Sequence, residues 1–180
     1  MEHHFTEQLI TPAAVLAIDP GGTTGIAVLP TWQSLGPDVH AMQVTTGKEL
    51  WELLHRYQPQ LIVYELFKLY AHKANTQIGN EFPSAQQIGI IRLYVELHPE
   101  CRAQGQMASQ AKLLVTDAAL RDLELVRPKQ PAAVHARDAM RHLVYYMITQ
   151  KPEHPWRTLF GLKQRPPKEA SAKRSQHDSD

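Results

Sequence analysis

Short apolar runs bounded by glycine and proline turns open the chain and predict β-strands. The first run, Val15 to Ile18, leads into Asp19-Pro20-Gly21-Gly22, and a second run covers Gly25 to Leu29. This arrangement predicts a strand, a tight turn and an antiparallel return strand. A weaker alternation from Val39 to Thr45 predicts a third strand.

The next apolar residues recur at the spacing of an amphipathic helix, which is predicted from Glu49 to Arg56 and is ended by Pro59. Its apolar face is made by Leu50, Leu53, Leu54 and Tyr57. The segment Gln60 to Glu65 then holds a continuous apolar stretch, which is typical of a central strand buried on both faces. Glu65 would end that strand at its carboxyl edge.

Three further helices are predicted, from Pro83 to about Leu97, from Ser109 to Leu120 and from Ala132 to Thr149, with a strand from Cys101 to Met107 between the first two. The order of strands and helices predicts an α/β fold with a mixed sheet flanked by helices. Residues 1–150 would form this domain. Residues 151–180 lack an apolar period and hold seven lysine or arginine residues against four acidic ones, which predicts a basic, disordered tail.

Length, charge and cysteine content limit the classes of protein to which this chain can belong. At 180 residues and 43% apolar content, the chain suits one well-buried domain. The formal net charge of +1 means that any basic surface must be local. A lone cysteine, Cys101, excludes an internal disulfide and argues against a thiolate zinc site. No apolar run is long enough to span a membrane and no signal-like stretch is present, so we expect a cytoplasmic protein without a membrane partner.

Two acidic residues end predicted strands and are candidate metal ligands. Asp19 meets a turn in which Gly21 and Gly22 leave room for a phosphate group, although Asp-Pro-Gly is also ordinary turn chemistry. When Glu65 ends a neighbouring strand at the same edge, the two carboxylates repel each other unless one is protonated or a cation bridges them. The alternative for Glu65 is a salt bridge to Lys68 or Arg137.

The last predicted helix carries polar residues beside its core stripe. His135, Asp138 and His142 follow one another at i, i+3 and i+7, and small alanines flank the first two. Asp138 is therefore a candidate ligand, whereas His135 is either a functional residue or an ordinary helix histidine. The core stripe itself is predicted to be Ala136, Ala139, Met140, Leu143, Val144 and Met147.

Taken together, these motifs resemble those of RuvC-type Holliday junction resolvases of the ribonuclease H-like superfamily, especially compact phage-type members. The resemblance rests on Ile18-Asp19-Pro20-Gly21 with Gly25 following, Tyr64-Glu65 at a strand end, and His135-Ala136-Arg137-Asp138-Ala139. It covers residues 15 to 149, and only the combination of the motifs in this order is specific.

The resemblance implies a site in which Asp19, Glu65, His135 and Asp138 surround two Mg²⁺ or Mn²⁺ ions that hydrolyse a DNA phosphodiester. His135 departs from relatives that carry aspartate at its position. A homodimer would place two such sites on opposite strands of a four-way junction. No organic small-molecule cofactor is expected.

Aromatic and basic residues beside the predicted site are candidates for nucleic-acid contacts. They are Phe67, Lys68, Tyr70 and Lys73, which follow Glu65, and Lys112 on the next predicted helix. The alternative is a solvated loop with Phe67 in the core. A dimer interface is predicted on the Pro83–Leu97 helix, because Ile90 and Tyr94 give it a second apolar face besides the one through Ile88, Ile91 and Val95.

Three other functions compete with the resolvase. A nuclease of the same fold that acts on RNA would use the same ion site. A binding or scaffold protein would have kept the fold without catalysis. An actin-like or sugar-kinase-like ATPase could use Asp19 with Gly22-Thr23-Thr24 as a phosphate loop, but that class needs two domains of this size.

Overall fold

A mixed five-stranded sheet forms the centre of the molecule, with strand order β3-β2-β1-β4-β5. The computed structural model describes residues 12–68, 81–126, 133–151 and 153–162. The strands are β1 (Val15–Asp19), β2 (Thr24–Leu29), β3 (His40–Val44), β4 (Leu61–Glu65) and β5 (Arg102–Gln106). β1, β2 and β3 pair antiparallel, while β4 and β5 continue the sheet in parallel with β1. The predicted mixed sheet flanked by helices is confirmed.

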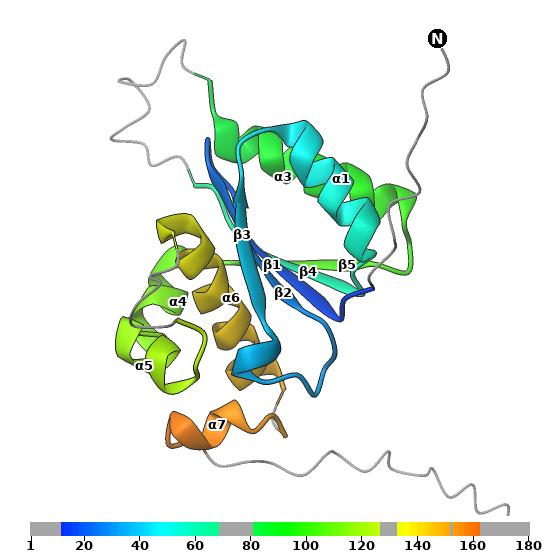
Figure 1. Cartoon of the computed structure of the whole chain (residues 1–180). Helices are drawn as coiled ribbons and strands as arrows, with labels where there is room; N and C mark the ends of the chain where they lie inside the picture. The colour runs from blue at the N-terminus through cyan, green and yellow to red at the C-terminus, as the bar shows by residue number, and fades with distance from the viewer. Residues whose placement is uncertain (1–11, 69–80, 127–132, 152, 163–180) are drawn as a thin grey trace, which may run out of the picture.

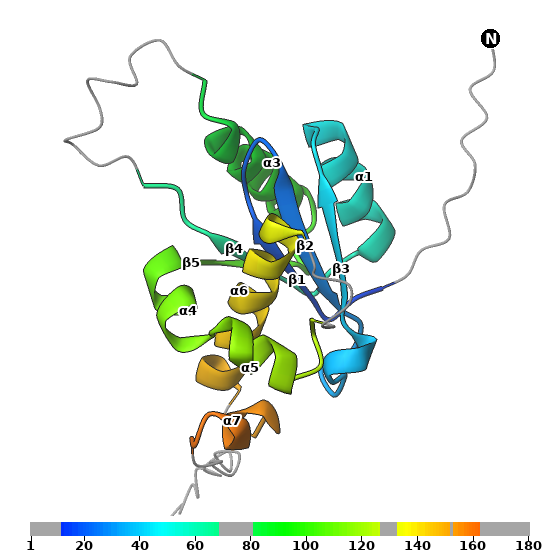
Figure 2. The same ribbon diagram turned by 60° about the vertical axis from the view of Figure 1, so that its left-hand side comes forward.

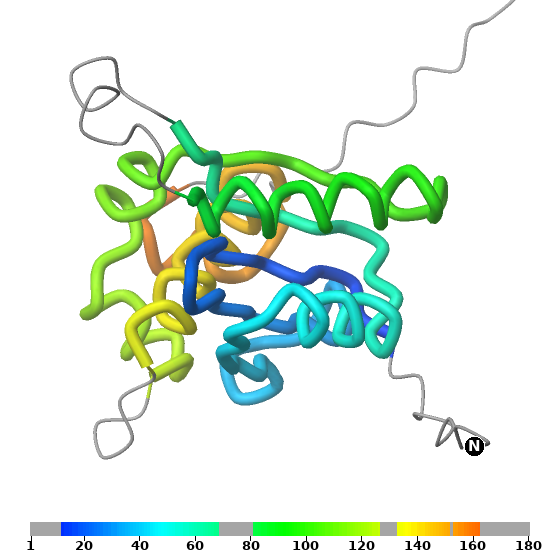
Figure 3. Tube along the Cα trace, turned by 90° about the horizontal axis from the view of Figure 1, so that it is seen from above, coloured from blue at the N-terminus to red at the C-terminus, as the bar shows by residue number. Residues whose placement is uncertain are grey.

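Helices cover both faces of this sheet (Figure 1). α1 (Gly47–Tyr57) and α3 (Pro83–Leu97) lie side by side on one face, as the view from above makes clear (Figure 3). α6 (Val134–Gln150) crosses the other face against β1 and β2, with α4 (Ala108–Leu114) packed beside it and α5 (Asp117–Asp122) next along the chain (Figure 2). A short 3-10 helix, η1 (Gly36–Asp38), precedes β3. None of the helices described is both long and apolar enough to cross a membrane.

Alternation of side chains along the strands divides the core into two layers. In β1, Leu16 and Ile18 face the α1 and α3 layer, whereas Val15 and Ala17 face α6. Burial on both faces explains why the central strands are apolar throughout rather than alternating. The same alternation decides to which face a strand-end side chain points, and it therefore decides the composition of the site.

Two predicted segments differ from the structure on the α6 side. The helix predicted from Ser109 to Leu120 is two helices, α4 and α5, because the Thr116 hydroxyl accepts a hydrogen bond from the N–H of Ala119 and starts a new helix. Within the predicted tail, α7 (Trp156–Leu159) is ordered, and Trp156 is buried in the core beneath α6. Residues 163–180 lie outside the described residues.

The second apolar face predicted for α3 is not available for a dimer. Tyr94 is buried against Trp51, with ring centroids 6.1 Å apart, and Ile90 packs against the core of the same layer. The large apolar side chains that α3 leaves exposed are Leu93 and Leu97. The specific face was wrong because periodicity alone did not reveal that α1 also covers this side of α3.

Candidate functional site

Three strands end side by side at one edge of the sheet, and their last side chains share a face. Ile18 pairs with Tyr64, so Asp19 and Glu65 follow at the same level, and Glu65 pairs with Gln106. Because Val15, Ala17, Leu61 and Val63 face α6, alternation turns Asp19 and Glu65 toward α6 as well. The prediction that the two strand-end acids meet at one edge agrees with this topology.

Gly25 allows α6 to approach the sheet at this point. It lies opposite Asp19 in the β1–β2 pair, and a Cβ atom on it would overlap the backbone carbonyl of His135. This close approach brings His135 Nδ1 to 2.9 Å from Asp19 Oδ2. His135, whose side chain is 44% exposed, therefore lies at the solvent side of the site.

Asp138, one helical turn after His135, is held by two cationic side chains. Lys112 Nζ lies 3.1 Å from Asp138 Oδ2, and Arg141 donates to Asp138 Oδ1. The same guanidinium group also donates to Asp117 and to the carbonyl oxygen of Val115. Arg141 thus ties the site to the turn between α4 and α5, and the Lys112 predicted to contact phosphate lies beside the third carboxylate.

Glu65 has a histidine partner that the sequence analysis did not identify as a site residue. His142 Nε2 lies 3.1 Å from Glu65 Oε2, and His142 Nδ1 lies 2.8 Å from Gln106 Oε1. Among the residues that the structure describes, Glu65 pairs with His142, and the alternative of a salt bridge to Lys68 or Arg137 is not present. The spacing of His142 with Asp138 was the available signal, but only the register of β5 reveals its second partner.

The charges collected at this edge act on the pKa values of Asp19 and Lys112. Burial raises the pKa of Asp19; the hydrogen bond from His135 opposes this rise, and the negative charges of Glu65 and Asp138 add to it. Burial alone would lower the pKa of Lys112, but its hydrogen bond to Asp138 and the charges of all three carboxylates raise it. A protein cation therefore compensates part of the negative charge collected here.

The carboxylate oxygens at this edge suit a hard divalent cation. In this structure, however, each carboxylate contacts a nitrogen-bearing side chain instead. Among the described residues, no three His, Cys, Asp or Glu side chains converge closely enough to hold a metal ion. Each acidic residue instead faces nitrogen partners: Asp19 faces His135, Glu65 faces His142, and Asp138 faces Lys112 and Arg141. Carboxylate oxygens that repel one another are nevertheless the ligands that Mg²⁺ and Mn²⁺ prefer.

The loop after β4 borders a cavity next to Glu65. The cavity has a volume of about 290 Å³, and Glu65, Phe67, Lys68 and Met107 are among its lining residues. Phe67 is 39% exposed and contacts the ring of Phe82 with centroids 5.5 Å apart, so it is not a core residue. Tyr70 and Lys73, the other predicted contacts of this loop, lie outside the described residues.

The turn after β1 is stabilised by hydrogen bonds between a side chain at its end and its own backbone. The buried hydroxyl of Thr24 donates to the carbonyl oxygen of Gly21 at 3.0 Å and accepts from the Gly21 N–H at 3.3 Å. Thr24 therefore serves the turn that presents Asp19. This use of its hydroxyl weakens the alternative of an ATPase phosphate loop.

Comparisons with known proteins identify the architecture. The solved structures that resemble this chain include one of RuvC from Thermus thermophilus, with a TM-score of 0.52, and one of T. thermophilus RuvC in complex with a Holliday junction substrate, with a TM-score of 0.50. Each is 18% identical in sequence and covers 73% of this chain and 93% of the RuvC chain. No protein-family model and no curated protein sequence matches the chain. The sheet order, the flanking helices and these superpositions establish that the chain has a RuvC-like, ribonuclease H-like fold.

Proposed function

We propose that this protein is a metal-dependent, structure-selective endonuclease that cleaves Holliday junctions or related branched DNA. The observation that carries the proposal is the placement of Asp19, Glu65 and Asp138 at one edge of a RuvC-like sheet, where burial raises the pKa of Asp19 and the charges of Glu65 and Asp138 add to the rise. Collecting three carboxylates at one edge costs stability unless partners compensate their charge, and this cost favours a functional reason for their placement. The solved complex of RuvC with a Holliday junction substrate supports branched DNA as the substrate class.

In this proposal Asp19, Glu65 and Asp138 hold two Mg²⁺ or Mn²⁺ ions, which would supply an activated water and neutralise the leaving 3′-oxygen. The protein's own groups then divide the remaining work. His135, exposed at the solvent side, orients Asp19 and serves as a further ligand or proton carrier. Asp138 would hold a cation in place of Lys112, and Lys112, which lies 3.1 Å from Asp138 in this structure, would then be placed to neutralise a DNA phosphate.

The loop after β4 is proposed to contact the junction itself. Phe67 is exposed beside the cavity next to Glu65, and Lys68 lines the same cavity. An exposed aromatic ring stacks on an unpaired base, and a lysine beside it neutralises the backbone. We assign Tyr70 and Lys73 the same two roles as an extension of this proposal.

A homodimer would present two sites to a four-way junction, and we propose that α3 contributes to it. The exposed Leu93 and Leu97 are four residues apart and therefore lie on one face of this helix. Replacing both with glutamate should convert a dimer to a monomer in light scattering at micromolar concentration. A wild-type protein that is monomeric with and without junction DNA would refute the dimer.

The test of the function is cleavage of labelled four-way junction, forked, linear duplex and RNA–DNA hybrid substrates with Mg²⁺, Mn²⁺ or EDTA. We expect metal-dependent cleavage of the junction in preference to the linear duplex. Preferential cleavage of the hybrid would support instead the RNA-directed nuclease of the same fold. Binding of junctions without cleavage under any metal condition would leave a binding protein and refute the nuclease.

A further inference from the structure

His142 is as buried as a core residue, but both of its ring nitrogens contact polar side chains. Its side chain is 1% exposed, and its two ring nitrogens contact two strand-end residues, Glu65 on β4 and Gln106 on β5. Glu65 and Gln106 are partners in the β4–β5 register, so one ring spans the two strand ends. An isosteric apolar residue would pack equally well here and leave Gln106 without this contact.

The hydrogen atoms of this contact can be assigned by counting donors and acceptors. An ionised Glu65 only accepts, so His142 Nε2 must carry a hydrogen. In a neutral imidazole Nδ1 is then an acceptor, and its partner on Gln106 must be the amide N–H₂ rather than the oxygen. Gln106 Nε2 is buried and lacks a partner when Oε1 faces the ring. Reversing the amide satisfies it and gives a chain from Gln106 through His142 to Glu65.

We propose that His142, oriented by Gln106, is a positioning residue that holds Glu65 ready for a divalent cation. Because Nε2–H engages only Oε2, Oε1 remains the oxygen through which Glu65 can bind a metal ion. This role rests on the proposed nuclease function and adds to it two residues, from β5 and α6. Hydrogen-bond partners of this kind fix the orientation of metal-ligating carboxylates.

The two histidines of α6, His135 and His142, differ in exposure, and this difference suits them to different roles. His135 is 44% exposed by its side chain and can leave Asp19 to bind a metal ion or a proton. His142 is buried, and its two ring nitrogens contact Gln106 and Glu65, so neither nitrogen can bind a cation without giving up one of these contacts. His135 is therefore suited to the reaction, and His142 is suited to holding the residue that takes part in it.

The first test compares two substitutions of His142 by Mn²⁺ binding in isothermal titration calorimetry. His142→Gln keeps an amide nitrogen at the place of Nε2, whereas His142→Phe keeps the ring volume and removes the donor. We expect His142→Phe to weaken Mn²⁺ affinity about 10- to 100-fold and His142→Gln to stay within about threefold of the wild type. His154→Phe is the matched control, because His154 is also buried but lies in the segment between α6 and α7.

The second test needs no variant and keeps the proposal falsifiable if His142→Phe fails to fold. Long-range ¹H–¹⁵N NMR spectra of the wild type report which ring nitrogen of each histidine carries hydrogen. We expect His142 to be the Nε2–H tautomer, with Nδ1 as the acceptor. A neutral His142 with hydrogen on Nδ1 would overturn the proposal, because it has nothing to donate to Glu65.

The outcomes separate this inference from the nuclease proposal. A protein that binds Mn²⁺ but cleaves no branched DNA would refute the function, while a loss in His142→Phe with retention in His142→Gln would still support the positioning role. Equal Mn²⁺ affinity of folded His142→Phe and wild type would overturn the positioning role even if junctions are cleaved. A wild type that does not bind Mn²⁺ would refute both.

Discussion

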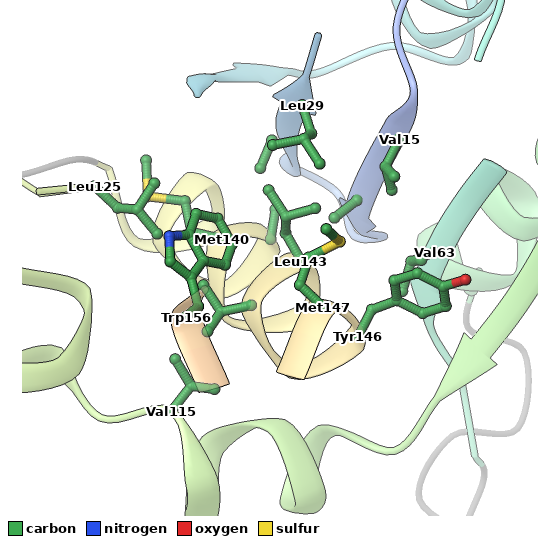
Figure 4. Close-up of a cluster of buried hydrophobic side chains, with 14 of the residues drawn as sticks. Val15, Leu29, Val63, Val115, Leu125, Met140, Leu143, Tyr146, Met147 and Trp156 are labelled. Atoms are coloured by element: carbon green, nitrogen blue, oxygen red, sulfur yellow. The ribbon is translucent and has the colours of Figure 1, made fainter. Parts of the chain in front are cut away.

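The two halves of α6 bury different kinds of side chain: the first half buries polar and charged groups beside its apolar ones, and the second half buries apolar and aromatic groups. In the first half, Asp138 is 8% exposed and His142 is 0% exposed, and each bonds to residues of other elements. In the second half, Leu143 and Met147 are both 0% exposed and meet the apolar side chains of β1 and β2, as Figure 4 shows for Leu29 and Val15. Burial therefore does not distinguish the site from the core.

What distinguishes the halves is their expected effect on stability. Burying apolar surface in the second half contributes about 25 cal/mol per Å² removed from water. Burying charged and polar groups in the first half gains little overall, because desolvation offsets the attraction between partners. The first half thus orders the site, and the second half supplies the stability that allows it. Substitutions in the two halves should separate activity from stability.

The largest expected effect is on cleavage by variants of the first half and of the strand ends that face it. Asp138→Asn, and likewise Asp19→Asn or Glu65→Gln, removes a charge without changing volume and should lower single-turnover cleavage of a four-way junction on the order of a thousandfold. Junction binding in a gel-shift assay should persist, because it depends on phosphate contacts elsewhere. Near-normal turnover in any of the three would refute its assignment as a metal ligand.

Substitutions in the second half of α6 should lower stability and leave cleavage nearly unchanged. Leu143→Ala leaves a cavity in the layer between α6 and the sheet and should cost about 2–5 kcal/mol of unfolding free energy in urea titrations. Cleavage per folded molecule should remain within about twofold of the wild type at low temperature. A selective loss of activity without loss of stability would show that the two halves of α6 are not separable.

An intermediate effect on the free energy of unfolding is expected for the ion pair between Arg141 and Asp138. Arg141→Met leaves Asp138 with Lys112 as its remaining cationic partner and should cost about 1–3 kcal/mol. In a double-mutant cycle with Asp138→Asn, the combined cost should be less than the sum of the two, because both variants remove the Arg141–Asp138 contact, although Arg141→Met also removes the contacts to Asp117 and Val115. Combining Asp138→Asn with Met147→Ala is the control, and there the costs should add within about 0.5 kcal/mol.

The smallest expected effect is the pH dependence of stability in Asp19→Asn. Since the pKa of Asp19 is raised in the folded protein, the folded state binds this proton more tightly than the unfolded state does. The wild type should therefore lose stability as pH rises from the ordinary pKa of 3.8 through the raised value, and the variant should not. In EDTA, Asp19→Asn should be as stable as the wild type at lower pH and slightly more stable at neutral pH. Mn²⁺ should reverse that order at neutral pH.

Much of the fold followed from apolar patterning, because burial on two faces leaves an unmistakable run in each central strand. The parallel pairing of β1 and β4 then made the meeting of Asp19 and Glu65 predictable. Other elements left no periodic signal. Thr116 breaks a continuous helical pattern with a single hydroxyl, and Trp156 is one buried residue in a polar segment.

The sequence predicted the three acids, His135 and Lys112, but not the residues that orient them. A carboxylate at the end of an apolar strand is unusual, whereas a histidine on a helix has the same spacing whether it packs, binds or orients. The role of His142 depends on β5, whose register with β4 places Gln106 beside Glu65. Arg141 was missed for the same reason, because Asp117 and the carbonyl of Val115 approach it from another element.

The hydrogen bond between His135 and Asp19 joins residues 116 positions apart, which has a consequence for how the protein is made. During synthesis, β1 and β2 leave the ribosome long before α6, so their α6-facing side chains stay uncovered while most of the chain is translated. Limited proteolysis of ribosome-bound chains of increasing length should show β1 becoming protected only after α6 has emerged. The carboxylates would thus be brought together in one of the last folding events, and a nascent chain would carry no complete nuclease site while its sheet is still assembling.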